Sequence, residues 1–131
     1  MSEIINPQDA ELEEVILGSC LIESKAITLI ADILRPEAFY NEKNLEIYAT
    51  LQSMYRNGQK IDIITVKEEL TRRGKLEFIG GPYTLAHISG RVASSAHLEY
   101  HARILKQKYI RRETILGFHK LLALAADETT D

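Results

Sequence analysis

The sequence has little cysteine and no long apolar segment. Cys20 is the only cysteine among 131 residues, so the chain can form no internal disulfide and no cysteine-based metal cage. Its small neighbours Gly18 and Ser19 indicate a packing role. No apolar run approaches the roughly 18 residues that a membrane-spanning helix needs, and the acidic N-terminus lacks the basic start of a signal peptide. We therefore expect a cytoplasmic protein that contacts no membrane.

The sequence also lacks the motifs of nucleotide hydrolysis and metal catalysis. No glycine stands five residues before a Gly-Lys-Ser/Thr group, so the phosphate-binding loop of P-loop ATPases is missing. His97 and His101 would share a helix face, but no third ligand is evident and the H-E-x-x-H order is not met. The carboxylates cluster where a helix dipole and solvation explain them. We predict that this chain is not an enzyme and binds no metal or cofactor.

What the sequence does contain is the composition of one soluble globular domain. Apolar residues make up 45% and charged residues 27%, and the net charge is −3. Residues 1–23 carry six acidic side chains and no basic one, whereas residues 95–120 carry six basic side chains and two acidic ones. Three interpretations of the basic stretch stay open: docking on the acidic first helix, a solvated face, or contact with nucleic acid. The net negative charge of the chain argues against strong nonspecific DNA binding.

The apolar periodicity predicts an all-α fold, a compact bundle of about six helices. Asn6 and Pro7 are expected to start the first helix, and Thr65 with Glu68 has the spacing of a capping box. Residues 61–66 are expected to be an extended connector, because no second apolar run exists to pair with them as a strand. The helices are expected at about residues 7–22, 26–34, 41–57, 65–74, 83–88 and 94–127.

The last helix is the most informative part of the sequence. Leu98, Ala102, Leu105 and Tyr109 form a regular stripe, which the polar residues 111–114 interrupt. Beyond that break, six apolar residues spread around most of the circumference: Ile115, Leu116, Phe118, Leu121, Leu122 and Leu124. Such a helix must be covered on more than one side, so we predict that another copy or a missing downstream segment covers it, and we expect an oligomerising protein. The alternative is that the earlier helices of the same chain wrap around it.

Short groups of residues along the chain together resemble the N-terminal domain of bacterial DnaB-type replicative DNA helicases, from about residue 7 to residue 127. The groups are, in order, Pro7-Gln8, Glu11, Glu13, Ile16-Leu17-Gly18, Pro36, Phe39-Tyr40, Ile47-Tyr48, Gly58, Ile61-Asp62-Ile63-Ile64-Thr65, Leu70, Gly74, Leu76, Gly80-Gly81, Ser95-Ala96, Tyr100, Ala102-Arg103-Ile104 and Arg111-Arg112. The chain departs from the family's usual residues at Asn44, His97 and residues 82–84.

The resemblance implies a domain organisation. It implies a disordered tail (residues 1–6), a globular helical head (residues 7–110) and the first arm of a helical hairpin (residues 111–131). The second hairpin arm and the ATPase motor domain are absent from this sequence. In the family, such domains form dimers and a trimer of dimers, which is the collar of the hexameric ring. The parent protein is expected to unwind DNA in the 5′ to 3′ direction with ATP and magnesium.

The resemblance also implies partners and contact residues. The expected partners are a second copy, primase and a helicase loader, with DNA contacted mainly through the absent motor domain. Self-association is assigned to Ile115, Phe118, Leu121 and Leu122. The candidate primase contacts are Glu11, Thr84, Arg111 and Arg112, and the alternative for each of these polar residues is an ion pair at the surface or within the chain. The alternative function is an accessory nucleic-acid-binding domain that uses the basic face of the last helix.

Overall fold

The computed structural model describes residues 8–127, and within that range it contains helices and no strand. The helices are α1 (Ala10–Ile22), the 3₁₀ helices η1 (Ala26–Leu29) and η2 (Pro36–Ala38), α2 (Glu42–Arg56), α3 (Ile63–Arg72), α4 (Pro82–Gly90) and α5 (Leu98–Ala126). The expected all-α class is confirmed. The disordered tail expected at residues 1–6 lies outside the described residues.

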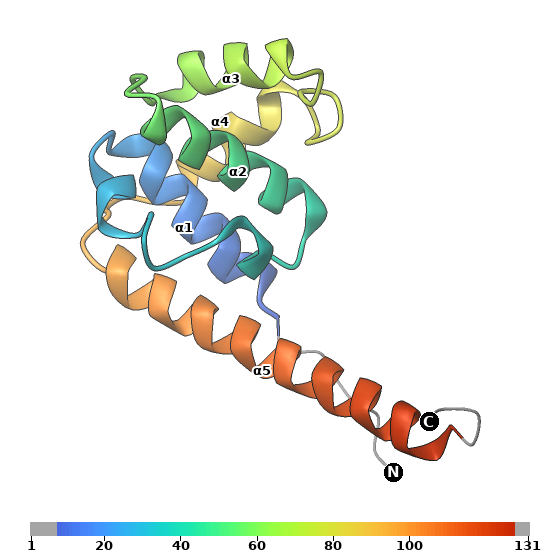
Figure 1. Cartoon of the computed structure of the whole chain (residues 1–131). Coiled ribbons are helices and arrows are strands. Elements are labelled where there is room, and N and C mark those ends of the chain that lie inside the picture. Colours follow the sequence, from blue (N-terminus) through green and yellow to red (C-terminus); the bar gives the residue numbers. More distant parts are fainter. Residues whose placement is uncertain (1–7, 128–131) are drawn as a thin grey trace.

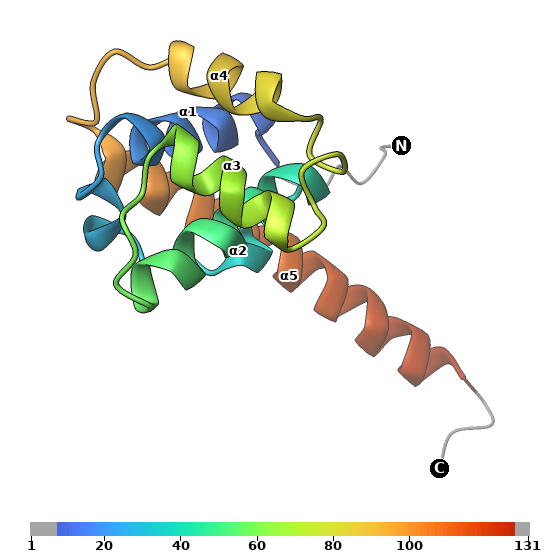
Figure 2. The ribbon, with the colours of Figure 1, turned by 90° about the horizontal axis from the view of Figure 1, so that it is seen from above.

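The helices form a compact head from which α5 projects. Figure 1 shows α1 to α4 packed together, with the first part of α5 running beneath them. Viewed from above in Figure 2, the remainder of α5 extends away from the head without another helix beside it. No helix within the described range is long and apolar enough to cross a membrane.

The helix α1 begins at a different residue from the one expected. Asp9 is its N-cap, because the Asp9 carboxylate accepts a 3.0 Å hydrogen bond from the backbone N–H of Leu12. A carboxylate in this position pairs with a backbone donor that the helix itself leaves unsatisfied. Asn6 and Pro7, which the sequence favoured for this role, lie outside the described residues.

The segment of residues 26–34 was expected to be one helix but is a 3₁₀ helix followed by turns. Side chains of α2 hold its last carbonyl groups. The Tyr48 hydroxyl donates to the Leu34 carbonyl over 3.1 Å, and Gln52 Nε2 donates to the Ala31 carbonyl over 3.1 Å. These tertiary bonds offer the carbonyl groups partners outside a regular helix, so no α-helix is needed to satisfy them.

The expectation of an extended connector at residues 61–66 was wrong, because α3 already begins at Ile63. Its N-cap is Asp62, and Thr65 fills the third helical position. The Asp62 carboxylate accepts from Thr65 N over 2.8 Å, and Thr65 Oγ1 accepts from Asp62 N over 2.9 Å. Thr65 therefore takes part in a capping box, as expected, but as its second member.

Every helix contributes buried residues to one core, which extends from Ile16 of α1 to Leu105 of α5. Phe39 and Tyr48 are both buried, and their stacked rings lie 4.7 Å apart between centroids. Close contact between α1 and α4 depends on Gly18, where an added Cβ would lie 2.6 Å from the Ile88 carbonyl oxygen. Cys20 is also buried, and burial raises its pKa to about 12, which supports the packing role expected for it.

Candidate self-association surface

The helix α5 has two halves with different surroundings. In the first half Leu98, Ala102 and Leu105 are buried against the head and Tyr109 is half-buried, which is the stripe that the sequence predicted. Arg112 is the last buried residue of the helix. None of residues 113–127 is buried. We call residues 113–126 the exposed half of α5.

The apolar side chains of the exposed half are uncovered. Leu116, Phe118, Leu121, Leu122 and Leu124 are between 42% and 65% exposed. Ile115 is half-buried. The alternative that earlier helices of the same chain wrap this segment is therefore wrong. The earlier helices do not extend along this segment, because α5 continues for about four turns past the edge of the head, at about 3.6 residues per turn. Assignment of Ile115, Phe118, Leu121 and Leu122 to self-association stays a prediction.

The uncovered surface lies mainly on the side of α5 that faces away from the head. At about 100° per residue, Leu121 is aligned with Ile110, and Phe118 lies beside them. Ile110 is itself 51% exposed, although it belongs to the half that contacts the head. The stripe that packs against the head, from Leu98 to Arg112, lies on the other side of the helix. A partner could therefore approach α5 without displacing the head.

The structure does not bring the four candidate primase contacts together. Glu11 is exposed on α1, Arg111 is exposed on α5, and Thr84 is half-buried on α4. Thr84 lines a cavity of about 270 Å³ between α1, α2 and α4, which neither Glu11 nor Arg111 reaches. Arg112 is only 5% exposed, with its guanidinium turned toward the head. Its position differs from the expected surface location and fits an internal contact.

Two aromatic residues beside Thr84 were not singled out from the sequence. Tyr83 is exposed, and its ring stacks on His87 one helical turn later, with 6.2 Å between the ring centroids. Both side chains line the cavity that Thr84 lines. Their i, i+4 spacing on a helix was the available signal. Exposed aromatic rings at the rim of a cavity are common at protein–protein contacts.

The carboxylates of α1 make contacts that the charge pattern of the sequence did not predict. Glu11 and Glu14 pair with Arg91, at the end of α4, over 3.3 Å and 3.1 Å. Glu13 is buried and accepts hydrogen bonds from the segment that precedes α2. The helix α1 does pack against α5. However, these contacts do not support the interpretation that attraction between the acidic and basic ends docks them together.

The basic side chains of α5 do not form one face. Arg103, Lys106, Arg111 and Lys120 are exposed, and at about 100° per residue they spread over about half of the helix circumference. Lys108 is half-buried and Arg112 points inward. A groove that follows a nucleic-acid backbone needs cations in one stripe. No observation favours the alternative of nucleic-acid binding, which stays a prediction.

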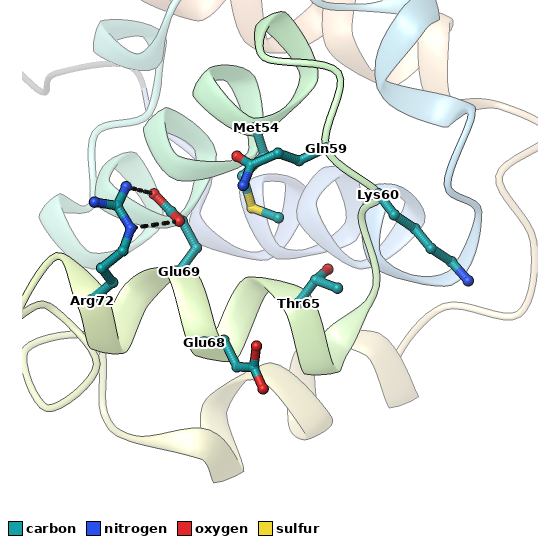
Figure 3. Close-up of a pocket in the computed structure, with 7 residues that line it drawn as sticks. All are labelled: Met54, Gln59, Lys60, Thr65, Glu68, Glu69 and Arg72. Atoms are coloured by element: carbon teal, nitrogen blue, oxygen red, sulfur yellow. Dashed lines mark hydrogen bonds and ion pairs between the residues drawn. The ribbon is translucent and has the colours of Figure 1, made fainter.

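A further cavity, of about 530 Å³, lies between α2 and α3. Figure 3 shows Arg72 directed at Glu69 and Lys60 directed away from it. Glu69 also accepts a 2.9 Å hydrogen bond from Arg73 Nε, and the hydrogen bonds from Arg72 and Arg73 lower the pKa of Glu69 to about 2. A carboxylate held in this ion pair is a poor general base. The cavity is therefore lined by a structural ion pair and offers no pair of catalytic groups.

The histidine pair does not assemble a metal site. The rings of His97 and His101 meet edge to face, with 6.3 Å between their centroids. Within residues 8–127 no group of three or more His, Cys, Asp or Glu side chains is placed to hold a metal ion. The two histidines are an exposed and a half-buried residue at the start of α5.

The fold and its surface define a small helical domain with an uncovered apolar helix. The family model described as DnaB-like helicase N terminal domain matches residues 5–107. The chain therefore belongs to the family of DnaB-like helicase N-terminal domains. The resemblance found in the sequence is confirmed.

Known proteins that this chain is similar to are much longer. The replicative DNA helicase DnaB of Rhodothermus marinus is 43% identical over 108 residues, which are 82% of this chain and 12% of that protein. The replicative DNA helicase DnaC of Bacillus subtilis is 33% identical over 119 residues, which are 88% of this chain and 26% of that protein. The chain thus spans about a quarter or less of the length of these relatives.

Two solved structures share the fold. The N-terminal domain of the DnaB helicase from Mycobacterium tuberculosis superposes with a TM-score of 0.89 and 30% sequence identity, covering 95% of this chain and 91% of that one. A DnaB-like replicative helicase, described together with its interactions with primase, gives a TM-score of 0.76 and 28% identity over 88% of this chain and 27% of that one.

Proposed function

We propose that this chain is the collar domain of a replicative DNA helicase, which self-associates through α5 and docks primase. The observation that carries the proposal is the exposed half of α5, where the large apolar side chains from Leu116 to Leu124 are uncovered over about two and a half helical turns. We assign ATP- and magnesium-dependent unwinding to the motor domain of the parent protein, because the curated relatives are replicative DNA helicases. Replication in bacteria places such a protein in the cytoplasm, at the nucleoid.

A helix with this surface is costly to leave in water. Burying apolar area contributes about 25 cal/mol per Å², and a soluble monomer seldom exposes a contiguous apolar patch of several hundred Å². Phe118, Leu121 and Leu122 are each more than 60% exposed. A second copy that covers the same face would form a two-fold contact, the commonest symmetry of soluble oligomers. Three such dimers would complete the hexameric collar that the family resemblance implies.

Self-association is tested with Leu121→Asp. The charge would be buried without a partner in the contact, which costs several kcal/mol. We expect sedimentation velocity to show monomers for Leu121→Asp, with the helicity by circular dichroism unchanged. Lys120→Asp is the control, because Lys120 is exposed on the same part of α5 but, at about 100° per residue, lies on the side of the helix opposite Phe118 and Leu122. Self-association of Leu121→Asp equal to that of the unaltered chain would refute this part of the proposal.

Primase docking is supported by the structural relative described with its interactions with primase. It is tested by titrating the C-terminal, helicase-binding domain of primase into the chain in a calorimeter. We expect Thr84→Glu to weaken binding at least tenfold, or about 1.4 kcal/mol. Thr71→Glu makes the same change at an exposed position of α3, away from the cavity, and should have no effect. No heat of binding with the unaltered chain would contradict docking on this domain.

A further inference from the structure

Arg112 lies at the point where α5 leaves the head. Its guanidinium carbon is 5.2 Å from the ring centroid of Tyr40 and 5.6 Å from that of Tyr109. Arg112 Nη2 also donates a 3.2 Å hydrogen bond to the carbonyl oxygen of Ala38. Both distances to the rings are within the range of cation–π contacts. One side chain of α5 thus contacts Ala38, the last residue of η2, and Tyr40, in the segment between η2 and α2.

Glu13 of α1 also holds the segment between η2 and α2. The Glu13 carboxylate accepts hydrogen bonds from Tyr40 N over 2.7 Å, Asn41 N over 3.3 Å and Asn44 Nδ2 over 3.0 Å. Glu13 is 1% exposed. The backbone of Tyr40 is therefore fixed to α1, while its ring contacts the guanidinium from α5. A chain of directional polar contacts connects α1 to the junction of the two halves of α5.

Arginine is suited to this position for a geometric reason. Its planar guanidinium can stack on aromatic rings with its faces while its edge donates hydrogen bonds. An apolar side chain could fill the same volume, but it would not select one direction of approach. Desolvating the charge is costly, so a buried arginine of this kind is better explained by the geometry it imposes than by the stability it adds.

We propose that Arg112 is a positioning residue, which fixes the direction in which the exposed half of α5 leaves the head. The helix ends at Ala126, fourteen residues later, which is about 21 Å along its axis. A tilt of about 10° at Arg112 would move that end by roughly 4 Å, a large part of the 5.4 Å helical pitch. Without the clamp that Arg112 forms with the rings of Tyr40 and Tyr109, the apolar side chains of one copy would lose their register with those of another. This consequence rests on the proposed self-association.

The test measures the direction of α5 within one chain. Spin labels on Lys67→Cys in α3 and Lys120→Cys in the exposed half of α5, with Cys20→Ser to remove the native thiol, report the distance between head and helix. Both label positions are exposed. Dilution with unlabelled chain suppresses distances between copies. In Arg112→Gln we expect the distance distribution to broaden by roughly a factor of two, because the exposed half of α5 is then free to tilt relative to the head.

Arg111→Gln is the matched control, because it removes the same charge from the neighbouring, exposed arginine. We expect its distance distribution to equal that of the unaltered chain. Arg112→Lys keeps the charge near the rings but loses the planar edge, so its distribution should have intermediate width. A structural contribution to head stability alone would not produce this order among the three variants. An unchanged distribution in folded Arg112→Gln overturns the inference.

A second variant keeps the inference testable if Arg112→Gln fails to fold. Tyr40→Leu removes one ring of the clamp but keeps the backbone N–H that Glu13 holds. It should broaden the distances in the same direction, and an unchanged distribution would overturn the inference. These distances are measured within one chain and in a Leu121→Asp background, so that a second copy does not hold the exposed half of α5. If the unaltered chain were found to be monomeric, the proposed function would fail while the role of Arg112 would still be decided by the distances.

Discussion

The Glu13 carboxylate lies 2.7 Å from the backbone nitrogen of Tyr40, which is 27 residues later in the chain. We expect Glu13→Gln to lower the free energy of unfolding by about 2 kcal/mol, because hydrogen bonds to a buried charged group contribute roughly 1.5–3 kcal/mol. The amide of glutamine would also point a donor at groups that are themselves donors. Urea unfolding at fixed protein concentration measures the change. Glu11→Gln, on the exposed face, should change it by less than about 0.5 kcal/mol.

Substitution of Gly18 should destabilise the head through a steric clash. An added Cβ would lie 2.6 Å from both the Ile88 carbonyl oxygen and Val92 Cγ2. We expect Gly18→Ala to cost about 1–3 kcal/mol in thermal or urea unfolding, more than the helix propensity it gains. Gly117→Ala, where nothing lies within 4 Å, should instead stabilise the helix by about 0.5–1 kcal/mol. That control is best measured with Leu121→Asp, so that self-association does not contribute. Equal effects of the two substitutions would contradict the close contact.

The ion pair of Glu69 should make stability depend on pH in the acid range. Hydrogen bonds from Arg72 and Arg73 lower the pKa of Glu69 from 4.5 to about 2 in the folded chain. The folded state therefore binds this proton less readily than the unfolded state, and the stabilisation is fully present above about pH 4.5. It is lost as the pH falls toward 2. We expect the difference in stability between the unaltered chain and Glu69→Gln to shrink over that range. A difference that does not change with pH would show that the ion pair contributes nothing.

The thiol of Cys20 should be unreactive while the chain is folded. Burial raises its pKa to about 12, so almost none of the reactive thiolate is present at pH 8. We expect an aromatic disulfide reagent to label the thiol slowly in buffer and rapidly in concentrated urea. Absorbance during the reaction gives both rates. Rapid labelling of the folded chain would show that the contact around Gly18 and Cys20 opens readily.

Sequence periodicity located the helices that depend on local signals. Asn41 caps α2, Gly81 is the N-cap of α4 and Pro82 its first residue, and α5 continues as one helix through the polar residues 111–114. The N-cap of α3 was harder to predict from the sequence, because two residues could have filled this position. Asp62 and Thr65 can both cap a helix, and the buried set formed by Ile61, Val66 and Leu70 favours the earlier start. That preference is a property of packing against α2 and α4.

The candidate self-association surface was also predicted only in part, because local sequence patterns do not specify contacts that depend on packing. The exposure of Phe118, Leu121 and Leu122 followed from counting apolar side chains against the size of the head. The inward position of Arg112 did not, because an arginine next to another arginine on a helix is usually solvated. The Tyr83 and His87 pair was visible in the sequence, but its location beside Thr84 depends on how α4 packs against α1 and α2.

The sequence by itself determined that the chain is helical and that its last helix carries more apolar surface than the head can cover, since both depend on residue type and spacing along one helix. Only the tertiary structure decided which charges are buried and which are exposed. Glu13 and Arg112 find their partners in a segment 25 or more residues away, and no local pattern specifies a contact over that separation. The direction of the exposed half of α5 is set there, where packing against the head ends.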